Sequence, residues 1–99
     1  MLSVYADGKY NFEYFMNREY AFNRDKGKCK CCGAVFSQTV VKHCHHVNNK
    51  LPLDRINKVP NLAWLCAPCH RMVHSNPILP NMDTKTVRKI KKYREKLSK

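Results

Sequence analysis

Three histidines and one cysteine fill four consecutive positions in the segment KHCHHV, residues 42–47. Two more histidines, His70 and His74, follow in the segment APCHRMVHS, residues 67–75. An imidazole can ligate a metal ion, act as a general base or respond to pH. If residues 67–75 form a helix, His70 and His74 lie four positions apart on one face, where two rings can hold one metal ion.

The neighbouring pair His45 and His46 offers a third ligand. Residues 39–47, TVVKHCHHV, are rich in β-branched side chains and predict a strand. Adjacent residues of a strand point to opposite faces, so only one member of the pair can join the helical histidines. The other is left for a different task. We interpret His43 as a strand residue that contacts solvent or a phosphate rather than as a catalytic group.

Two cysteine pairs form a second cluster, with the spacing Cys29-x-x-Cys32-Gly33 and Cys66-x-x-Cys69. Each pair presents two thiolates from a tight turn, and two such pairs predict a tetrahedral four-cysteine site for structural Zn²⁺. Such a site leaves no open coordination position, so we expect it to stabilise the fold rather than to react.

The clustered cysteines also bear on the cellular compartment of the protein. No apolar run of signal-peptide or membrane-span length occurs, which predicts a cytoplasmic protein without a membrane partner. In a reducing cytosol, clustered cysteines bind metal more often than they form disulfides, although a secreted disulfide scaffold is the alternative. Outside the two pairs, Cys31 and Cys44 are expected to be ordinary thiols, with Cys44 acting as a small buried hydrophobe.

The length of the chain predicts a small domain that needs a stabilising cross-link, and its charge predicts a polyanionic partner. A chain of 99 residues is expected to form one domain, residues 1–99, with a thin core that needs a staple such as a metal ion. The net charge of +12 predicts binding to a polyanion, and nucleic acid is the first candidate.

Hydrophobic periodicity divides the chain into an N-terminal helix (10–27), a central region with the clusters (28–75) and a C-terminal helix (83–99). Asn11 is the predicted cap of the first helix and Gly27 its stop. We expect this helix to cover the core through an apolar stripe. The stripe comprises Phe12, Phe15, Met16 and Phe22.

The central region predicts a strand at 61–66, NLAWLC, after an irregular loop, and then the helix 67–75. Trp64 and Leu65 are expected in the core.

The C-terminal helix, capped by Asp83 or Thr84, is strongly basic. Its eight positive charges face a single acidic residue, Glu95, and favour binding to a nucleic-acid backbone, although a merely solvated face is the alternative. The eight are Lys85, Arg88, Lys89, Lys91, Lys92, Arg94, Lys96 and Lys99. Arg71 is interpreted as either a solvated charge or a phosphate contact. The expected DNA contacts are Arg71, Lys85, Arg88, Lys89 and Lys92.

These motifs, in this order, resemble the HNH endonucleases of the ββα-metal class. The resemblance covers residues 18–75, and the spacing from His46 to Asn61 and on to His70 is similar to that of colicin-type DNases. The motifs that carry it are Cys29-x-x-Cys32-Gly33, His45-His46-Val47, Asn61-Leu62 and Leu65-Cys66-x-x-Cys69-His70-x-x-x-His74.

The resemblance implies a small α+β ββα-metal fold with a zinc ion on the four cysteines and flanking helices. It also implies hydrolysis of DNA phosphodiester bonds to 5′-phosphate and 3′-hydroxyl ends, with no small-molecule substrate. His46 would be the general base, and Asn61 would order the loop behind it or reach the metal. A catalytic divalent ion would be held by His45, His70 and His74. The imidazole-rich site favours Mn²⁺, Ni²⁺ or Zn²⁺ over Mg²⁺ alone, because many relatives carry aspartate at the position of His45.

A narrower resemblance concerns the HNH domain at the C-terminus of group II intron-encoded reverse transcriptases. It is carried by the stretches EYFMNREYAFNRDKGKCKCCG, HCHH and LPLDRINKVPNLAWLCAPCHRMVHS. It implies nicking of a target strand for intron mobility, within a larger intron-encoded protein that binds RNA, or a freestanding relative of bacterial or phage origin. The alternative from another functional class is a zinc-stapled DNA-binding module that does not cleave.

Overall fold

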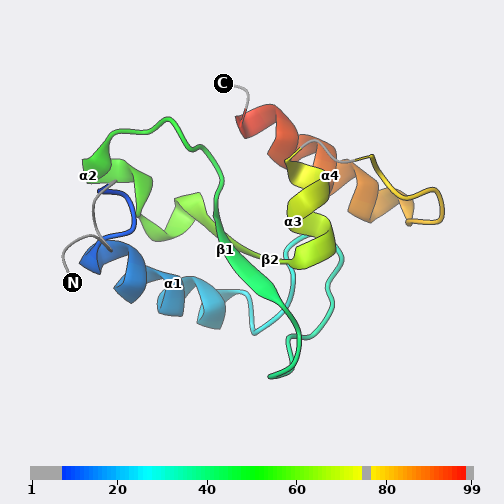
Figure 1. Cartoon of the computed structure of the whole chain (residues 1–99), viewed down its shortest axis with the longest axis horizontal. Helices are drawn as coiled ribbons and strands as arrows, with labels where there is room; N and C mark the ends of the chain where they lie inside the picture. The colour runs from blue at the N-terminus through cyan, green and yellow to red at the C-terminus, as the bar shows by residue number, and fades with distance from the viewer. Residues whose placement is uncertain (1–7, 75–76, 98–99) are drawn as a thin grey trace.

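The computed structural model describes residues 8–74 and 77–97. This part of the chain is a small α+β fold with one two-stranded antiparallel sheet and four α-helices (Figure 1). The elements are α1 (Phe12–Arg24), β1 (Lys42–His46), α2 (Leu53–Ile56), the 3-10 helix η2 (Val59–Asn61), β2 (Leu62–Cys66), α3 (Ala67–Val73) and α4 (Thr84–Leu97).

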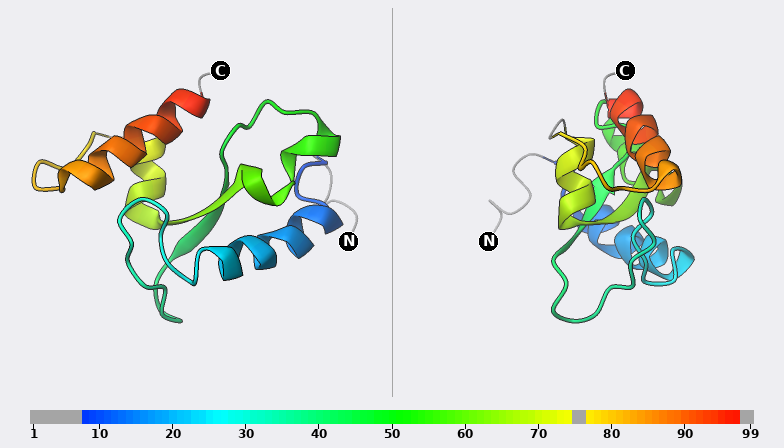
Figure 2. Two further views of the ribbon diagram at one scale, coloured as in Figure 1. Left: turned by 180° about the vertical axis from the view of Figure 1, so that it is seen from behind. Right: turned by 90° about the vertical axis from the view of Figure 1, so that its right-hand side faces the viewer.

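The register of the sheet separates the two adjacent histidines. In the antiparallel pair, His45 lies opposite Ala63 and His46 lies opposite Leu62. Cross-strand partners share a face and neighbours alternate, so His45 and His46 face opposite sides. The helix α1 lies on one side of the strands, and α3 and α4 lie on the other (Figure 2). The expected division of the histidine pair between two faces is therefore confirmed.

Each face of the sheet has its own hydrophobic cluster. Leu65 is fully buried with Met72 and Val73 of α3 and Ile90 of α4. On the other face, Trp64 is 8% exposed among side chains of α1, and its indole Nε1 donates a hydrogen bond to the Arg18 carbonyl. The expected core positions of Trp64 and Leu65 are confirmed, and the sheet is held from both sides.

The ends of α1 follow the predicted signals. The Asn11 side-chain oxygen accepts a hydrogen bond from the Tyr14 backbone N–H at 3.0 Å, which satisfies one of the free donors of the first turn. Gly27 takes a positive φ of 67°, and its N–H donates to the Phe22 carbonyl. Lys26 also takes a positive φ, of 58°, so the backbone leaves the helix directly after the cap residue Asp25 and before Gly27.

Only part of the predicted apolar stripe of α1 faces the core: Phe15 and Phe22 pack against the cluster that contains Trp64. Phe12 is 73% exposed and Met16 is 44% exposed, whereas Tyr14 and Ala21 are buried against the sheet. The reason is a polar anchor that periodicity does not reveal. The Tyr14 hydroxyl donates a hydrogen bond to the Cys44 carbonyl at 3.0 Å, so the helix turns this face inward.

The loop expected between the strands contains two short helices. α2 begins after Pro52, whose fixed φ suits a helix start, and η2 leads directly into β2. At the other end of the chain, Asp83 caps α4 by accepting from the Thr86 N–H at 2.9 Å, as predicted. α3 ends at Val73, just before the second of its two histidines. The predictions that concern Ser75, Ser98 and Lys99 lie outside the described residues.

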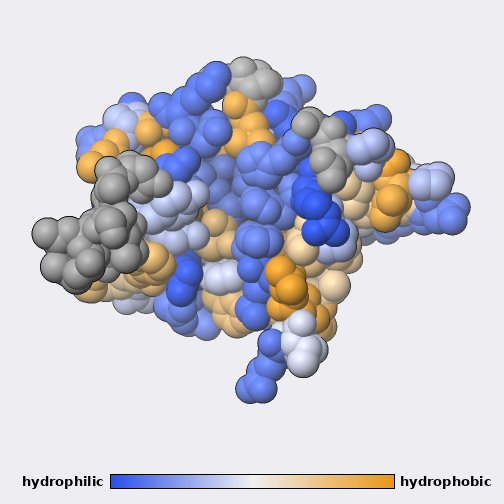
Figure 3. All heavy atoms as spheres, viewed as in Figure 1, coloured by the Kyte–Doolittle hydropathy of each residue, from blue (hydrophilic) through white to orange (hydrophobic). Residues whose placement is uncertain are grey.

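None of the helices in residues 8–74 and 77–97 combines the length and the apolar character that a bilayer span requires. Figure 3 shows a mainly hydrophilic surface at the centre of one face, with smaller apolar areas around it.

Candidate metal centres and nucleic-acid surface

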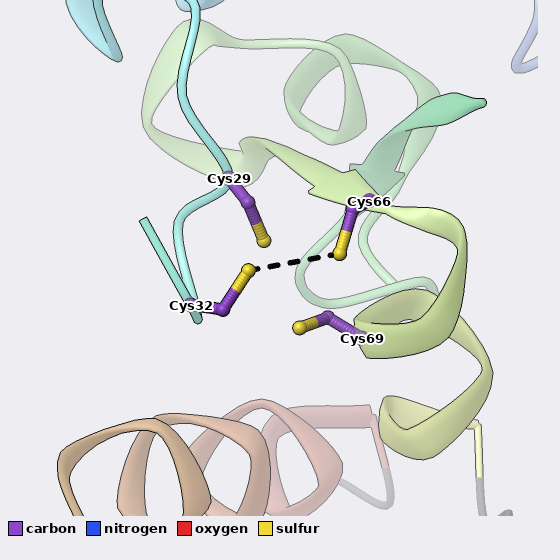
Figure 4. Close-up of side chains that lie close together, drawn as sticks. All are labelled: Cys29, Cys32, Cys66 and Cys69. Carbon is purple, nitrogen blue, oxygen red and sulfur yellow. Dashed lines mark hydrogen bonds between the residues drawn. The ribbon is translucent and has the colours of Figure 1, made fainter. Parts of the chain in front are cut away.

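The four predicted cysteine ligands meet at one point. The Sγ atoms of Cys29, Cys32, Cys66 and Cys69 all lie within 4.8 Å of one another. Figure 4 shows two thiols from the loop after α1 facing one from the end of β2 and one from the first turn of α3. This set, which we call the four-cysteine cluster, can hold a metal ion in the tetrahedral geometry that the spacing predicted.

The backbone of the first pair is shaped for metal ligands. The Cys29 N–H donates to the Ala34 carbonyl at 2.9 Å, and the Gly33 N–H donates back to the Cys29 carbonyl at 3.0 Å. Gly33 completes this turn with a φ of 79°. The Cys31 N–H points at the Cys29 sulfur at 3.4 Å, as donors do around a thiolate. Cys31 itself is buried beside the cluster and is not one of its four ligands.

The four thiol groups lie so close together that they shift one another's pKa values. A hydrogen bond from Cys69 lowers the pKa of the Cys29 thiol to about 4 and raises the pKa of the Cys69 thiol. Burial raises the pKa of the Cys66 thiol to about 11. The pKa of the Cys29 thiol is thus shifted downward, while those of Cys66 and Cys69 are shifted upward. A divalent ion at the centre would stabilise all four thiolates together.

The three predicted imidazole ligands also meet. Ligand nitrogens of His45, His70 and His74 lie within 4.8 Å of one another. The ring centroids are separated by 5.3 Å for His45 and His70, 5.1 Å for His45 and His74, and 4.6 Å for His70 and His74. His74 is also the C-cap residue of α3, so the end of the helix presents its ring to β1.

The environment of His45 fits a metal ligand. The residue is 3% exposed, and its buried Nε2 has no hydrogen-bond partner among residues 8–74 and 77–97. Burial lowers the pKa of His45 to about 3 and that of His70 to about 4, with further repulsion from the neighbouring imidazoles. Both rings are therefore neutral at physiological pH and offer a lone pair. An unpaired buried nitrogen is costly, and a metal ion would remove that cost.

His46 has a different set of neighbours. Its ring contacts Tyr10 and Tyr14, with centroid separations of 5.6 Å and 5.1 Å. Its Nε2 lies 2.7 Å from the side-chain oxygen of Asn57, which is completely buried. Sequence reasoning missed Asn57, because a single asparagine in an expected loop gives no motif. His46 nevertheless lines the same pocket as His45.

Asn61 holds the loop behind the histidine pair. Its side-chain oxygen accepts from the Asn48 N–H at 2.9 Å, and its amide donates to the carbonyls of Asn48 and Ile56. Its carbonyl accepts from the Val47 N–H at 2.8 Å. Asn61 does not line the histidine pocket, so its contacts agree with loop ordering and not with metal contact.

One pocket of about 270 Å³ unites the histidines. It spans the outer side of β1, where His45 meets α3 on one face and His46 meets α1 on the other. Lys9 and Asn49 line it as well, together with Leu97 from α4. The exposed ring of His43 stacks on the ring of His70 with a centroid separation of 4.7 Å. His43, which we expected to contact solvent or a phosphate, therefore also lines the pocket.

The expected nucleic-acid contacts fall on different surfaces. Lys89 and Lys92 lie around Tyr93 in a shallow depression of about 200 Å³ that we call the lysine groove. Two further lysines complete it: Lys30 from the cysteine loop and Lys96 from α4. Sequence reasoning missed Lys30, since nothing in its local pattern places it beside α4.

The remaining expected contacts do not join the lysine groove. Lys85 and Arg88 are exposed on α4 outside it, and Arg71 lines a separate surface beside Leu79. Arg94 donates from Nε to the Met72 carbonyl at 2.6 Å, so one of the basic residues of α4 serves helix packing.

Comparisons with protein-family models, with curated proteins and with solved structures give no match for this chain.

Proposed function

We propose that this chain is a metal-dependent DNA endonuclease of the HNH, or ββα-metal, kind. The observation that carries the proposal is the arrangement around β1. Three imidazoles gather on one face, the adjacent His46 lies on the other, and all four rings line a single pocket. A metal-activated hydrolase needs such a division between groups that hold the ion and a group that takes a proton.

The order of elements supports the same proposal. Two antiparallel strands are followed directly by the helix α3, with the candidate ligands at the end of β1 and along α3. This is the order that a ββα-metal domain requires. Asn61, which ties the loop after β1, stands where the family motif has its asparagine.

In the proposed reaction, His45, His70 and His74 would hold a divalent ion through their ring nitrogens. When bound, that ion would stabilise negative charge on the phosphate and on the leaving 3′ oxygen. His46 takes a proton from the attacking water, and cleavage leaves a 5′-phosphate and a 3′-hydroxyl. Three nitrogen donors without a carboxylate suit Mn²⁺, Ni²⁺ or Zn²⁺ better than Mg²⁺.

The four-cysteine cluster has a structural part in the proposal. Four sulfur donors favour Zn²⁺, and a closed shell of four leaves no room for substrate. We assign Zn²⁺ to this site as a staple for a thin core.

The DNA partner is supported by charge. A net charge of +12 accompanies a groove with four lysines around a tyrosine. Ammonium groups at this density contact phosphates without reading sequence. The narrower setting, an HNH domain of an intron-encoded protein or a freestanding relative, rests on the sequence resemblance.

The second candidate is a zinc-stapled DNA-binding module that does not cleave. The lysine groove and the histidine pocket share no lining residue, although the Tyr93 ring of the groove lies 6.2 Å from the His45 ring, centroid to centroid. Binding through the groove would not need the histidines.

Incubation with supercoiled plasmid tests the proposal. Zinc-loaded protein with Mn²⁺, Ni²⁺, Zn²⁺ or Mg²⁺ in separate reactions should convert supercoiled DNA to nicked or linear forms with at least one ion. Ligation of the products after removal of protein would verify 5′-phosphate and 3′-hydroxyl ends. DNA binding without conversion under any ion would favour the second candidate.

A further inference from the structure

The ring of His43 is arranged differently from the rings of the three candidate metal ligands. Those of His45, His70 and His74 meet edge to face, at interplanar angles of 71°, 82° and 89°. The ring of His43 lies closer to parallel with that of His70, at an interplanar angle of 27° and a centroid separation of 4.7 Å. Offset stacks of this kind are favourable for two aromatic rings. His43 therefore covers one face of the His70 ring.

The sheet fixes the place of His43 in this stack. The residue lies opposite Leu65 of β2, whose side chain is fully buried. Alternation along β1 puts His43 and His45 on the same face of the strand, two positions apart. The ring of His70, from α3, contacts both of them. The stacking partner of His70 is thus held by the strand and does not need a metal ion to bring it there.

The His70 ring needs a neighbour that holds its direction. The last side-chain torsion of a histidine has a broad energy profile, so packing decides where the ring nitrogens point. His45 is 3% exposed and enclosed by the core, whereas His70 is only half-buried. Three rings contact His70 in the described part of the chain, and those of His45 and His74 are themselves candidate ligands. The third ring, that of His43, can hold His70 without sharing its ion.

The geometry separates His43 from the ligand set. Ligand nitrogens of His45, His70 and His74 lie within 4.8 Å of one another, and His43 does not belong to that group. A metal ion binds an imidazole nitrogen in the plane of the ring, whereas His43 lies against the face of His70. His43 is therefore placed to support a ligand and not to be one.

We propose that His43 is a positioning residue of the candidate metal centre, whose stacked ring keeps the His70 nitrogen directed toward the ion. The inference rests on the metal site of the proposed function, but it does not depend on DNA cleavage. A ligand whose ring is already held by packing loses less freedom when the ion binds, so the ion binds more tightly.

Calorimetric titration of Ni²⁺ into tag-free, zinc-loaded protein tests this proposal. Ni²⁺ is the probe because nitrogen-rich sites bind it more tightly than Mn²⁺. The variant His45→Ala removes a candidate ligand and so identifies the part of the signal that belongs to the three-histidine site. Because His43 is exposed, its substitution should leave the core intact.

Three variants separate the ring of His43 from its polarity and from the strand. His43→Phe keeps an aromatic ring without nitrogens and should retain the wild-type affinity for Ni²⁺. His43→Val keeps the preference for a strand, and His43→Gln keeps a polar side chain, but both lack the ring. Each of these two should bind Ni²⁺ about 2- to 10-fold more weakly, the effect expected from the loss of one ring–ring contact.

The outcomes keep this inference apart from the proposed function. Wild-type affinity in both His43→Val and His43→Gln would overturn the positioning role. A loss in His43→Phe as large as that in His43→Val would also overturn it, because the nitrogens of His43 would then be what matters. A wild-type titration without any signal that His45→Ala removes would overturn the metal site and this inference together. The expected order of affinities without plasmid cleavage under any ion would support the positioning role and count against the proposed function.

Discussion

The side chains of His45 and His46 leave β1 in opposite directions, and this gives the two rings different chemistry. His45 lies among imidazoles, where burial keeps it neutral and leaves one nitrogen without a partner in the described chain. His46 lies among tyrosines and is bonded to an amide. Two adjacent residues therefore have different surroundings, which fit the proposed metal ligand His45 and the proposed general base His46.

Tyr14→Phe should reveal the polar anchor of α1. The variant loses the hydroxyl that donates to the Cys44 carbonyl, and at neutral pH its free energy of unfolding should fall by about 1 kcal/mol. Burial raises the pKa of Tyr14 far above its usual value of about 10. Above about pH 10, the unfolded wild type ionises at this residue while the folded state does not, so wild-type stability declines with rising pH.

The stability gap between the two proteins should therefore narrow above about pH 10, because phenylalanine cannot ionise. Denaturant unfolding from about pH 7 to about pH 11 measures this gap. Tyr20→Phe, at a residue that is 60% exposed, is the matched control and should change little at neutral pH. A gap for Tyr14→Phe that stays constant across this range would contradict the assignment.

Some site residues follow from spacing, and others do not. The grouping of His45 with His70 and His74 follows from strand alternation and from the helical i, i+4 rule, so it could be predicted. Asn57 could not, because the partners of its amide nitrogen lie more than forty positions away. Its role arises only when the start of the chain folds over the loop.

At the scale of elements, the end of β2 and the start of α3 together carry candidate ligands of both centres. Cys66 ends β2, Cys69 lies in the first turn of α3, and His70 is the next residue. A metal ion on the cysteines would therefore fix the start of α3 and with it the direction of His70. The four-cysteine cluster and the histidine pocket are connected through this single turn.

The lysine groove should bind the DNA backbone. The double variant Lys92→Gln/Lys96→Gln removes two charges from the groove and should weaken DNA binding at low salt. The slope of log affinity against log salt should become shallower by about two. Each phosphate contact that forms releases counterions from the DNA, so a variant with two fewer contacts releases fewer of them on binding. Fluorescence anisotropy with a short duplex at several salt concentrations measures both quantities.

The matched control is Lys26→Gln/Lys50→Gln, two exposed lysines outside the groove with the same change of net charge. Equal effects of the two double variants would mean that overall charge, not the groove, binds DNA.

The existence of most elements could be predicted, but their orientation could not. The caps at Asn11 and Asp83 are local signals, and the structure confirms them. The strand predicted at 39–47 exists only as Lys42–His46, so the β-branched residues that predicted it lie outside β1. The inward face of α1 depends on Tyr14 reaching Cys44, a contact thirty positions apart. The helices α2 and η2 lie in a proline-punctuated stretch, which gives no local signal that distinguishes them from a loop.

At the scale of the whole molecule, we expect the fold to depend on a metal ion at the four-cysteine cluster. The described core is split into two small clusters on either side of a two-stranded sheet. Each cluster is small, so a metal ion on the cysteines would add to the stability of a thin core. Three of the four cysteine ligands, Cys29, Cys66 and Cys69, are buried in the cluster that also contains Leu65, so a metal ion there would reinforce the core directly.

Removal of zinc should therefore unfold the protein. Binding of structural Zn²⁺ contributes on the order of 10 kcal/mol, and in small metal-stapled domains this is folding free energy. Cys69→Ser should give a protein without bound zinc and without cooperative thermal unfolding, measured by elemental analysis and circular dichroism. Cys44→Ser, at a half-buried thiol outside the cluster, is the control and should retain one zinc per chain. Folded, zinc-free Cys69→Ser would contradict the staple.

The central claim is that two adjacent histidines divide metal binding from proton transfer. The most direct measurement is paired: calorimetric titration of Mn²⁺ into zinc-loaded protein, and plasmid cleavage by the same sample, for wild type, His46→Ala and His45→Ala. His46→Ala should keep the affinity for Mn²⁺ while cleavage falls by roughly two to four orders of magnitude, the usual contribution of a general base. His45→Ala should weaken Mn²⁺ binding, with partial recovery of cleavage at high Mn²⁺. Loss of Mn²⁺ binding in His46→Ala, with binding and cleavage intact in His45→Ala, would contradict the account.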